Sequence, residues 1–407
     1  MVPNNDAWSI LTLIDKQVHL ERRRVLSKAL SDNALRTFEP SMLQHMDIFH
    51  QQVATQIDAN GWSMPKNMSD YSMRLTFDIM CDFGFGQNFS LQTNRSLDYI
   101  PKVLKNYSWR MGIYEQYPKL ANLNIEILAE FFRFGNDLKT RFEEWARGFA
   151  LSVMDETNEK PHGQFSLIRE FRDSTGKKFN EVELKAEGSF LILAGSETTG
   201  ITMSAIFFYL AHNSDIYKKL ATEVRSVFSD VSEICSGEKL LSCSYLSACV
   251  TETLRICPPV PGTPWREVEG DGIKVDTEYI PAGCNVGTSM YAIHHNETYF
   301  PSAYIFDPER WLSSSSEEQR ELAHSAFNPF SLGPRGCAGR SMALSELNLL
   351  VARTMFLYDF RLADGPLGAV GRGAPEKGKL RSRENEYQVF ANITSYSDGP
   401  WIIFKKV

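Results

Sequence analysis

Apolar residues recur at intervals of three and four over seven long stretches of the chain. This spacing places apolar side chains on one face of an α-helix. We therefore expect helices over residues 40–58, 66–83, 118–155, 181–211, 214–229, 243–257 and 339–356. Strand-like segments are short and lie late in the chain, at 272–275, 285–290, 391–394 and 401–406, and the turn SDGP joins the last two. The pattern predicts a mainly α protein with small β-sheets, of the α+β class.

The segment from Gly188 to Ala211 is long and apolar enough to cross a bilayer. Its centre, however, carries Ser196, Glu197 and Thr198 in a row, and a carboxylate at the middle of a bilayer is costly. We therefore expect a helix that is buried in the protein core and has a polar notch at its centre. The first residues contain neither a signal peptide nor another apolar run of that length, so we expect a soluble chain.

Composition narrows the class of protein further. The chain has 407 residues, of which 43% are hydrophobic, so it can bury a large core. A net charge of -7 argues against a general nucleic-acid binder, because phosphate contacts need a concentrated basic surface. Seven cysteines without a CxxC pair favour free thiols in a reducing compartment over a disulfide framework. We find no repeat and no interdomain linker, which favours one domain over residues 1–407.

The loop FSLGPRGCAG, residues 330–339, places three glycines and a proline around Cys337, just before a predicted helix. Unpaired amides and the helix dipole at a helix start favour an anion, so we expect a lowered thiol pKa and a thiolate. Glycines let the backbone bend so that N–H groups can face the sulfur, and Phe330 would shield the sulfur from water. This chemistry suits a nucleophile or a metal ligand. It is equally compatible with a buried cysteine in a glycine-rich loop.

The whole string carries more information than the cysteine alone. Phe330, Gly333, Arg335, Cys337 and Gly339 occupy every fixed position of the pattern FxxGxRxCxG, which marks the haem-binding loop of the cytochrome P450 family. The chain resembles that family over nearly all of its length. The resemblance implies the cytochrome P450 fold and haem b, with Cys337 as the axial thiolate ligand of the iron. Thiolate donation pushes electron density to the iron and favours O–O cleavage.

A second family signature is ExxR, which Glu252 and Arg255 match. The pattern occurs five times in this chain, and elsewhere it is typical of an exposed ion pair on a helix. The resemblance assigns Arg310, in DPERW, as the third member of a buried charge triad. A carboxylate between two cations can be buried only if its hydrogen bonds are complete, so the loss of one member should be severe.

The polar notch resembles the oxygen-binding groove of the family at Ala194, Gly195, Glu197 and Thr198. Gly195 has no side chain and the Thr198 hydroxyl can divert a backbone carbonyl, so the helix could open there for dioxygen and water. A carboxylic acid beside a hydroxyl also suits a proton relay, with Glu197 and Thr198 as the catalytic residues. The alternative is a Ser/Thr patch packed against a neighbouring helix.

Haem carries two propionates, which require cationic partners. The resemblance nominates His19, Arg23, Arg266 and Arg335. Arginine suits bidentate pairing with a carboxylate, whereas many relatives have tryptophan where this chain has His19.

The resemblance indicates only the chemical class of the substrate. Several segments are similar to the filamentous-fungal branch that decorates polyketides, terpenoids and other natural products, which implies a lipophilic small molecule. By similarity, five residues should line its apolar pocket: Val260, Gly262, Thr263, Thr394 and Tyr396.

The resemblance implies a haem-thiolate monooxygenase that receives electrons from NADPH through NADPH–cytochrome P450 reductase. The chain has no flavin or dinucleotide motif of its own. Relatives begin with a membrane anchor and lie on the cytoplasmic face of the endoplasmic reticulum; here we expect one cytochrome P450 domain without its N-terminal portion. Two alternatives remain: an isomerase or dehydratase of the same family that uses no dioxygen, and an inactive haem-binding remnant.

Overall fold

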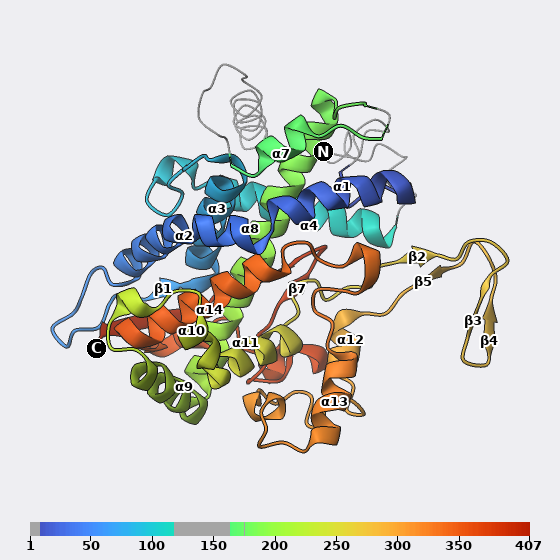
Figure 1. Cartoon of the computed structure of the whole chain (residues 1–407). Helices are drawn as coiled ribbons and strands as arrows, with labels where there is room; N and C mark the ends of the chain where they lie inside the picture. Colours follow the sequence, from blue (N-terminus) through green and yellow to red (C-terminus); the bar gives the residue numbers. More distant parts are fainter. Residues whose placement is uncertain (1–8, 118–162, 175) are drawn as a thin grey trace.

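The computed structural model describes residues 9–117, 163–174 and 176–407, and its long central helix is α8 (Figure 1). The helices are α1 (Lys16–Ala29), α2 (Asp32–Val53), α3 (Met68–Phe85), α4 (Ile100–Gln116), α7 (Phe165–Glu170), α8 (Glu181–His212), α9 (Ser214–Val227), α10 (Glu238–Ser242), α11 (Ser244–Ile256), α12 (Met290–His294), α13 (Glu317–Ala326) and α14 (Arg340–Leu357).

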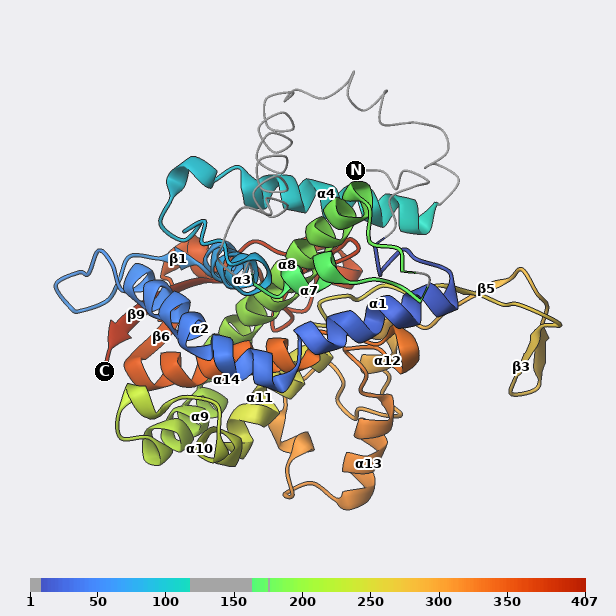
Figure 2. The same cartoon turned by 45° about the horizontal axis from the view of Figure 1, so that its top comes forward.

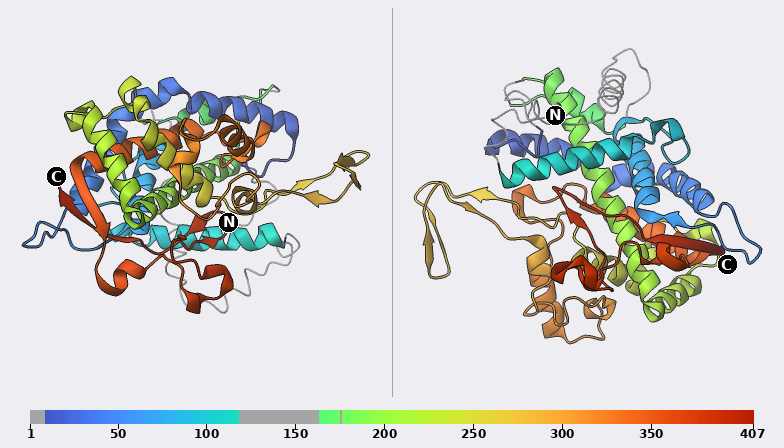
Figure 3. Two further views of the ribbon diagram at one scale, coloured as in Figure 1. Left: turned by 90° about the horizontal axis from the view of Figure 1, so that it is seen from below. Right: turned by 180° about the vertical axis from the view of Figure 1, so that it is seen from behind.

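The strands are short and all paired antiparallel. The largest sheet has the order β1 (Lys66–Asn67), β9 (Trp401–Lys406) and β6 (Tyr358–Leu362). Three further pairs are β2 (Arg266–Glu267) with β5 (Asn285–Val286), β3 (Ile273–Val275) with β4 (Glu278–Ile280), and β7 (Phe390–Ala391) with β8 (Ser395–Tyr396). The β2–β5 pair and the β3–β4 hairpin form an arm that extends from the helical body (Figures 1 and 3). The prediction of a mainly α fold with small sheets is confirmed.

Helix α8 begins at an N-terminal capping box, and most of its length lies in the core of the protein. The Asn180 side chain accepts the N–H of Glu183, and the Glu183 carboxylate accepts the N–H of Asn180, which is a reciprocal capping box. Among the described helices, α8 alone has the length and composition of a membrane span, and 72% of its most apolar window is buried within the protein. This agrees with the predicted core helix.

The main hydrophobic core joins α8 to the helices and strands around it. Met42 of α2, Leu75 of α3, Ile206 of α8, Leu254 of α11 and Leu350 of α14 are all buried in it. Figure 2 shows α4 crossing over α8, with α14 on the other side of α8. Helices α8 and α11, which carry predicted site residues, therefore share this core with α14, which follows the cysteine loop.

The strand predicted at 401–406 is confirmed as β9, whereas the strands predicted at 285–290 and 391–394 are wrong over most of their length, and one helix prediction lies outside the described residues. Residues 392–394 form the turn between β7 and β8, closed by the N–H of Asn392 and the carbonyl of Thr394, and are not a strand. The segment at 401–406 pairs with β6 and β1, because Phe404 lies opposite Phe360 and both join the core. The helix predicted at 118–155 falls outside the described residues.

Candidate functional site

The cysteine loop is closed by its own backbone immediately before α14. The N–H of Cys337 donates to the carbonyl of Phe330 over 2.7 Å, and the N–H of Gly336 donates to the carbonyl of Gly333 over 3.0 Å. Gly333 has φ +70, a left-handed conformation that favours glycine. These bonds hold Cys337 just before Gly339, which is the N-cap of α14.

The Cys337 side chain is exposed, yet the surrounding protein raises the pKa of its thiol. Desolvation is the larger effect, and it outweighs the backbone hydrogen bond with Gly339 and the positive charge of Arg23, both of which lower the pKa. The predicted lowering of the thiol pKa is therefore wrong for the chain alone. Cys337 is therefore exposed enough to meet a ligand, although the surrounding protein desolvates its thiol.

Four basic side chains, three arginines and one histidine, gather beside this loop. His19 and Arg23 lie one turn apart on α1, Arg335 lies in the loop and Arg266 lies on β2. Burial, followed by the charges of Arg335 and Arg23, lowers the pKa of His19. Burial, followed by the charge of Arg266, lowers the pKa of Arg335. The charges of Arg23 and Arg335 thus reach His19, and the charge of Arg266 reaches Arg335.

The arginines of this cluster donate to backbone carbonyls, since Arg23 binds Gly336, Arg335 binds Ile10 and Arg266 binds Trp265. Within the part of the chain that the structure describes, none of the three forms an ion pair with a carboxylate. A cationic cluster without a counter-ion, next to an accessible thiol, suits a group that combines a metal with two carboxylates. The donor set therefore fits haem.

Glu252 and Arg255 of α11 are fully buried and form a two-point ion pair. Arg255 donates to Glu252 through Nε (2.9 Å, to Oε2) and Nη2 (2.7 Å, to Oε1). Three further donors complete the carboxylate: Arg310 Nε at 3.1 Å, Trp311 Nε1 at 2.9 Å and the N–H of Asp307 at 3.0 Å. The structure thus brings together the three residues nominated as a triad, and it adds Trp311, which the sequence reasoning missed.

Arg255 also connects α11 to the segment that leads to the cysteine loop. Arg255 Nη1 donates to the carbonyls of His294 and Ala303, each over 2.8 Å. The His294 ring in turn accepts the N–H of Asn328 over 3.3 Å, just before the loop begins. Burial, followed by the charge of Arg255, lowers the pKa of His294 to about 3, so the ring is a neutral acceptor. A run of hydrogen bonds therefore links Glu252 to the start of the loop.

The notch in α8 has the hydroxyl arrangement that the sequence suggested. Thr198 Oγ1 donates to the carbonyl of Ala194 over 2.6 Å, and both residues are half-buried. Gly195, in contrast, faces α3, because a Cβ there would lie 2.3 Å from Sδ of Met80. We therefore attribute the need for glycine at position 195 to close helix packing.

Glu197 is buried within a small cluster of hydroxyl groups. Ser108 of α4 and Thr394 of the β7–β8 turn both donate to its Oε2. Burial raises the pKa of Glu197 to about 7, and these two hydrogen bonds oppose the shift. Thr394 was expected to line the substrate pocket, but its hydroxyl binds Glu197. Ser108 was not predicted at all.

The other residues predicted for the pocket lie on two segments that the structure joins. The N–H of Ser395 donates to the carbonyl of Pro259 over 2.8 Å, which ties the β7–β8 hairpin to the loop after α11. On that loop Val260 is exposed, while Gly262 and Thr263 are half-buried; Tyr396 on β8 is also half-buried.

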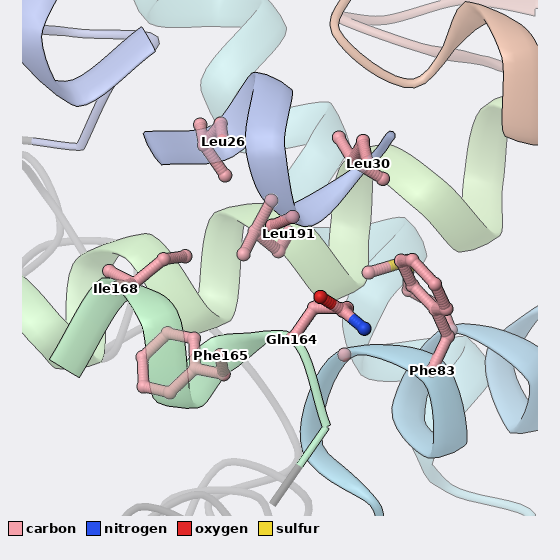
Figure 4. Close-up of a pocket in the computed structure, with 10 residues that line it drawn as sticks. Leu26, Leu30, Phe83, Gln164, Phe165, Ile168 and Leu191 are labelled. Atoms are coloured by element: carbon pink, nitrogen blue, oxygen red, sulfur yellow. The ribbon is translucent and has the colours of Figure 1, made fainter. Parts of the chain in front are cut away.

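A separate apolar pocket lies between α1, α3, α7 and α8 (Figure 4). It is lined by Leu26, Ala29, Leu30, Met80, Phe83, Gly84, Gln164, Phe165, Ile168 and Leu191. Met80 also packs against Gly195, so this pocket is on the α3 side of α8. It contains no thiol and no charged group, and we do not assign it to the site.

Comparison with known proteins decides the family. A family model described as Cytochrome P450 matches residues 9–369. The chain belongs to the cytochrome P450 family. Its relatives include cytochrome P450 monooxygenases of Alternaria alternata (34% identical, covering 98% of this chain and 78% of the relative) and Gibberella zeae (34%, covering 98% and 92%). Another, from Gibberella fujikuroi, is 35% identical over 97% of this chain and 77% of the relative. This cytochrome P450 is thus similar to monooxygenases of fungi.

Proposed function

We propose that the chain is a haem-thiolate monooxygenase that inserts one oxygen atom of O2 into a lipophilic small molecule. The substrate R–H, O2, NADPH and one proton become R–OH, H2O and NADP+, and a separate NADPH–cytochrome P450 reductase delivers the two electrons. The observation that carries this proposal is the exposed Cys337 in its closed loop, beside three arginines that form no ion pair with a carboxylate of the described residues. The proposal also places the enzyme in fungal natural-product biosynthesis, at the cytoplasmic face of the endoplasmic reticulum; its support is membership of the cytochrome P450 family and similarity to fungal monooxygenases.

Each group of residues then has a distinct task. Haem, when bound, supplies the reductive activation of dioxygen. Cys337 holds the iron, and His19, Arg23, Arg266 and Arg335 hold the propionates. Thr198 and Glu197 supply protons: a carboxyl group with a pKa of about 7 is partly protonated at neutral pH, so it can both give and regain a proton.

The proposal is tested by the spectrum of the purified, haem-loaded chain. After reduction and addition of carbon monoxide we expect the strongly red-shifted Soret band of a thiolate-ligated ferrous haem. A band at the position typical of a histidine-ligated haem, or no bound haem, would contradict the proposal.

The relay makes a second prediction, which also separates a monooxygenase from an isomerase or dehydratase of the same family. Thr198→Ala is expected to keep the carbon monoxide band but to release most of the NADPH-derived electrons as hydrogen peroxide, because proton supply is misdirected. The measurement is hydrogen peroxide formed per NADPH consumed, with added reductase.

A matched control for this variant lies one turn along α8. Thr202 Oγ1 donates to the carbonyl of Thr198 over 2.9 Å, the same type of bond, so Thr202→Ala should leave the peroxide yield unchanged. Coupled turnover by Thr198→Ala would refute the relay. Turnover of a substrate without NADPH would favour the isomerase.

A further inference from the structure

Glu197 is held in an unusual way, because both of its hydrogen-bond donors bind the same carboxyl oxygen. Ser108 and Thr394 donate to Oε2, and their hydroxyl oxygens lie 3.2 Å from each other. Ser108 is 2% exposed and Thr394 is 7% exposed. Among the described residues no hydrogen bond involves Oε1, and that atom is not among the buried unpaired ones. The two oxygens of one carboxyl group therefore differ in their surroundings.

We propose that Ser108 and Thr394 are positioning residues that dock Oε2 of Glu197 and so leave Oε1 as the oxygen that carries the transferable proton. An oxygen that accepts two hydrogen bonds has little capacity to bind a proton as well, so the proton of the neutral acid resides on its partner. The inference rests on the proposed monooxygenase function, since it concerns the proton donor of that reaction. It adds two residues to the proton supply and names the atom that carries the proton.

The docked carboxyl group also connects three elements of the fold. Glu197 lies on α8, Ser108 on α4 and Thr394 in the turn of the β7–β8 hairpin. Helix α4 packs closely on that turn, because a Cβ at Gly112 would lie 3.1 Å from the backbone of Asn392. A ligand that shifts α4 or the hairpin would therefore move the donors to Glu197 as well.

The electrostatics of Glu197 give this arrangement a measurable property. Burial raises the pKa of the acid, and the hydrogen bonds from Ser108 and Thr394 lower it. Within the described parts of α4, α8 and the β7–β8 hairpin, no charged side chain contributes to the shift. A hydroxyl that donates to a carboxylate stabilises its ionised form, so removal of either hydroxyl should raise the pKa further.

The test is an infrared titration of the Glu197 carboxylic C=O band, assigned by subtraction of the spectrum of Glu197→Gln. The intact chain should show a midpoint near pH 7. Ser108→Ala and Thr394→Val should each shift the midpoint upward by about one unit, because each removes one hydrogen bond to the ionised form. Ser108→Thr and Thr394→Ser keep the hydroxyl group, so their midpoints should equal that of the intact chain. They also show whether a shift comes from the lost hydroxyl group or from unfolding.

Ser204→Ala is the matched control, because this buried α8 serine binds the carbonyls of Met68 and Gly200 and has no hydrogen bond to Glu197. Its midpoint should match that of the intact chain. A midpoint that stays the same or falls in both Ser108→Ala and Thr394→Val overturns the inference. The titration needs no haem, so it gives a result even if the carbon monoxide band is absent and the monooxygenase proposal fails.

Discussion

Cys337→Ser is expected to eliminate the red-shifted carbon monoxide band and to reduce NADPH-dependent oxygenation below detection. Serine keeps the shape of the loop, but its hydroxyl group is a far poorer donor to iron than a thiolate. The closed loop does not depend on the sulfur, because the bond from the Cys337 N–H to Phe330 is made by backbone atoms. The variant should therefore fold. The loss of the band and of oxygenation can then be assigned to the missing thiolate ligand.

The spectrum of reduced protein with carbon monoxide measures this effect, and circular dichroism checks the fold. Cys235 offers a matched control, because it is the other exposed cysteine and lies before α10. Cys235→Ser should keep the full band. If Cys337→Ser retained the red-shifted band, another side chain would have to be the ligand.

Glu252→Ala is expected to cost about 3–5 kcal/mol of unfolding free energy, because it leaves the buried charge of Arg255 uncompensated. That is a large share of the about 5–15 kcal/mol that stabilises a typical protein. The loop beyond His294 should lose its support as well, so we expect the purified variant to retain little haem.

Urea unfolding and the ratio of haem to protein measure the two effects. Glu317 belongs to another ExxR sequence, and it lies exposed in the first turn of α13. Glu317→Ala should change the unfolding free energy by less than about 1 kcal/mol, as is usual for exposed charges. Glu252→Ala with wild-type stability and haem content would rule out a supporting role for the triad.

The sequence predicts long apolar helices well and polar ones poorly. The α8 and α14 helices are within one residue of their predicted bounds at each end, because their apolar positions recur over many turns. Helix α1 was not predicted from periodicity, since most of its side chains are polar or charged and few apolar positions mark its buried face. The pairing of β9 with β6 was missed because it joins segments that are distant in sequence.

In the site, too, local sequence patterns could be read, whereas contacts between distant residues could not. Cys337 could be nominated from sequence because its motif is local and dense in fixed positions. The partner of Glu197 on α4, Ser108, is 89 residues away and of a common type, so no local signal identifies it. The direction of the Cys337 pKa was missed because a sequence shows a helix start but not the desolvation around it.

The hydrogen bond that supports the start of the cysteine loop does not depend on pH over the range found inside cells. Its acceptor is the neutral ring of His294, which would gain a charge only near pH 3. Glu197, in contrast, changes charge near pH 7. A mild fall in cellular pH would thus protonate Glu197, the proposed proton donor, while the hydrogen bond that supports the loop of Cys337, the proposed metal ligand, would not change.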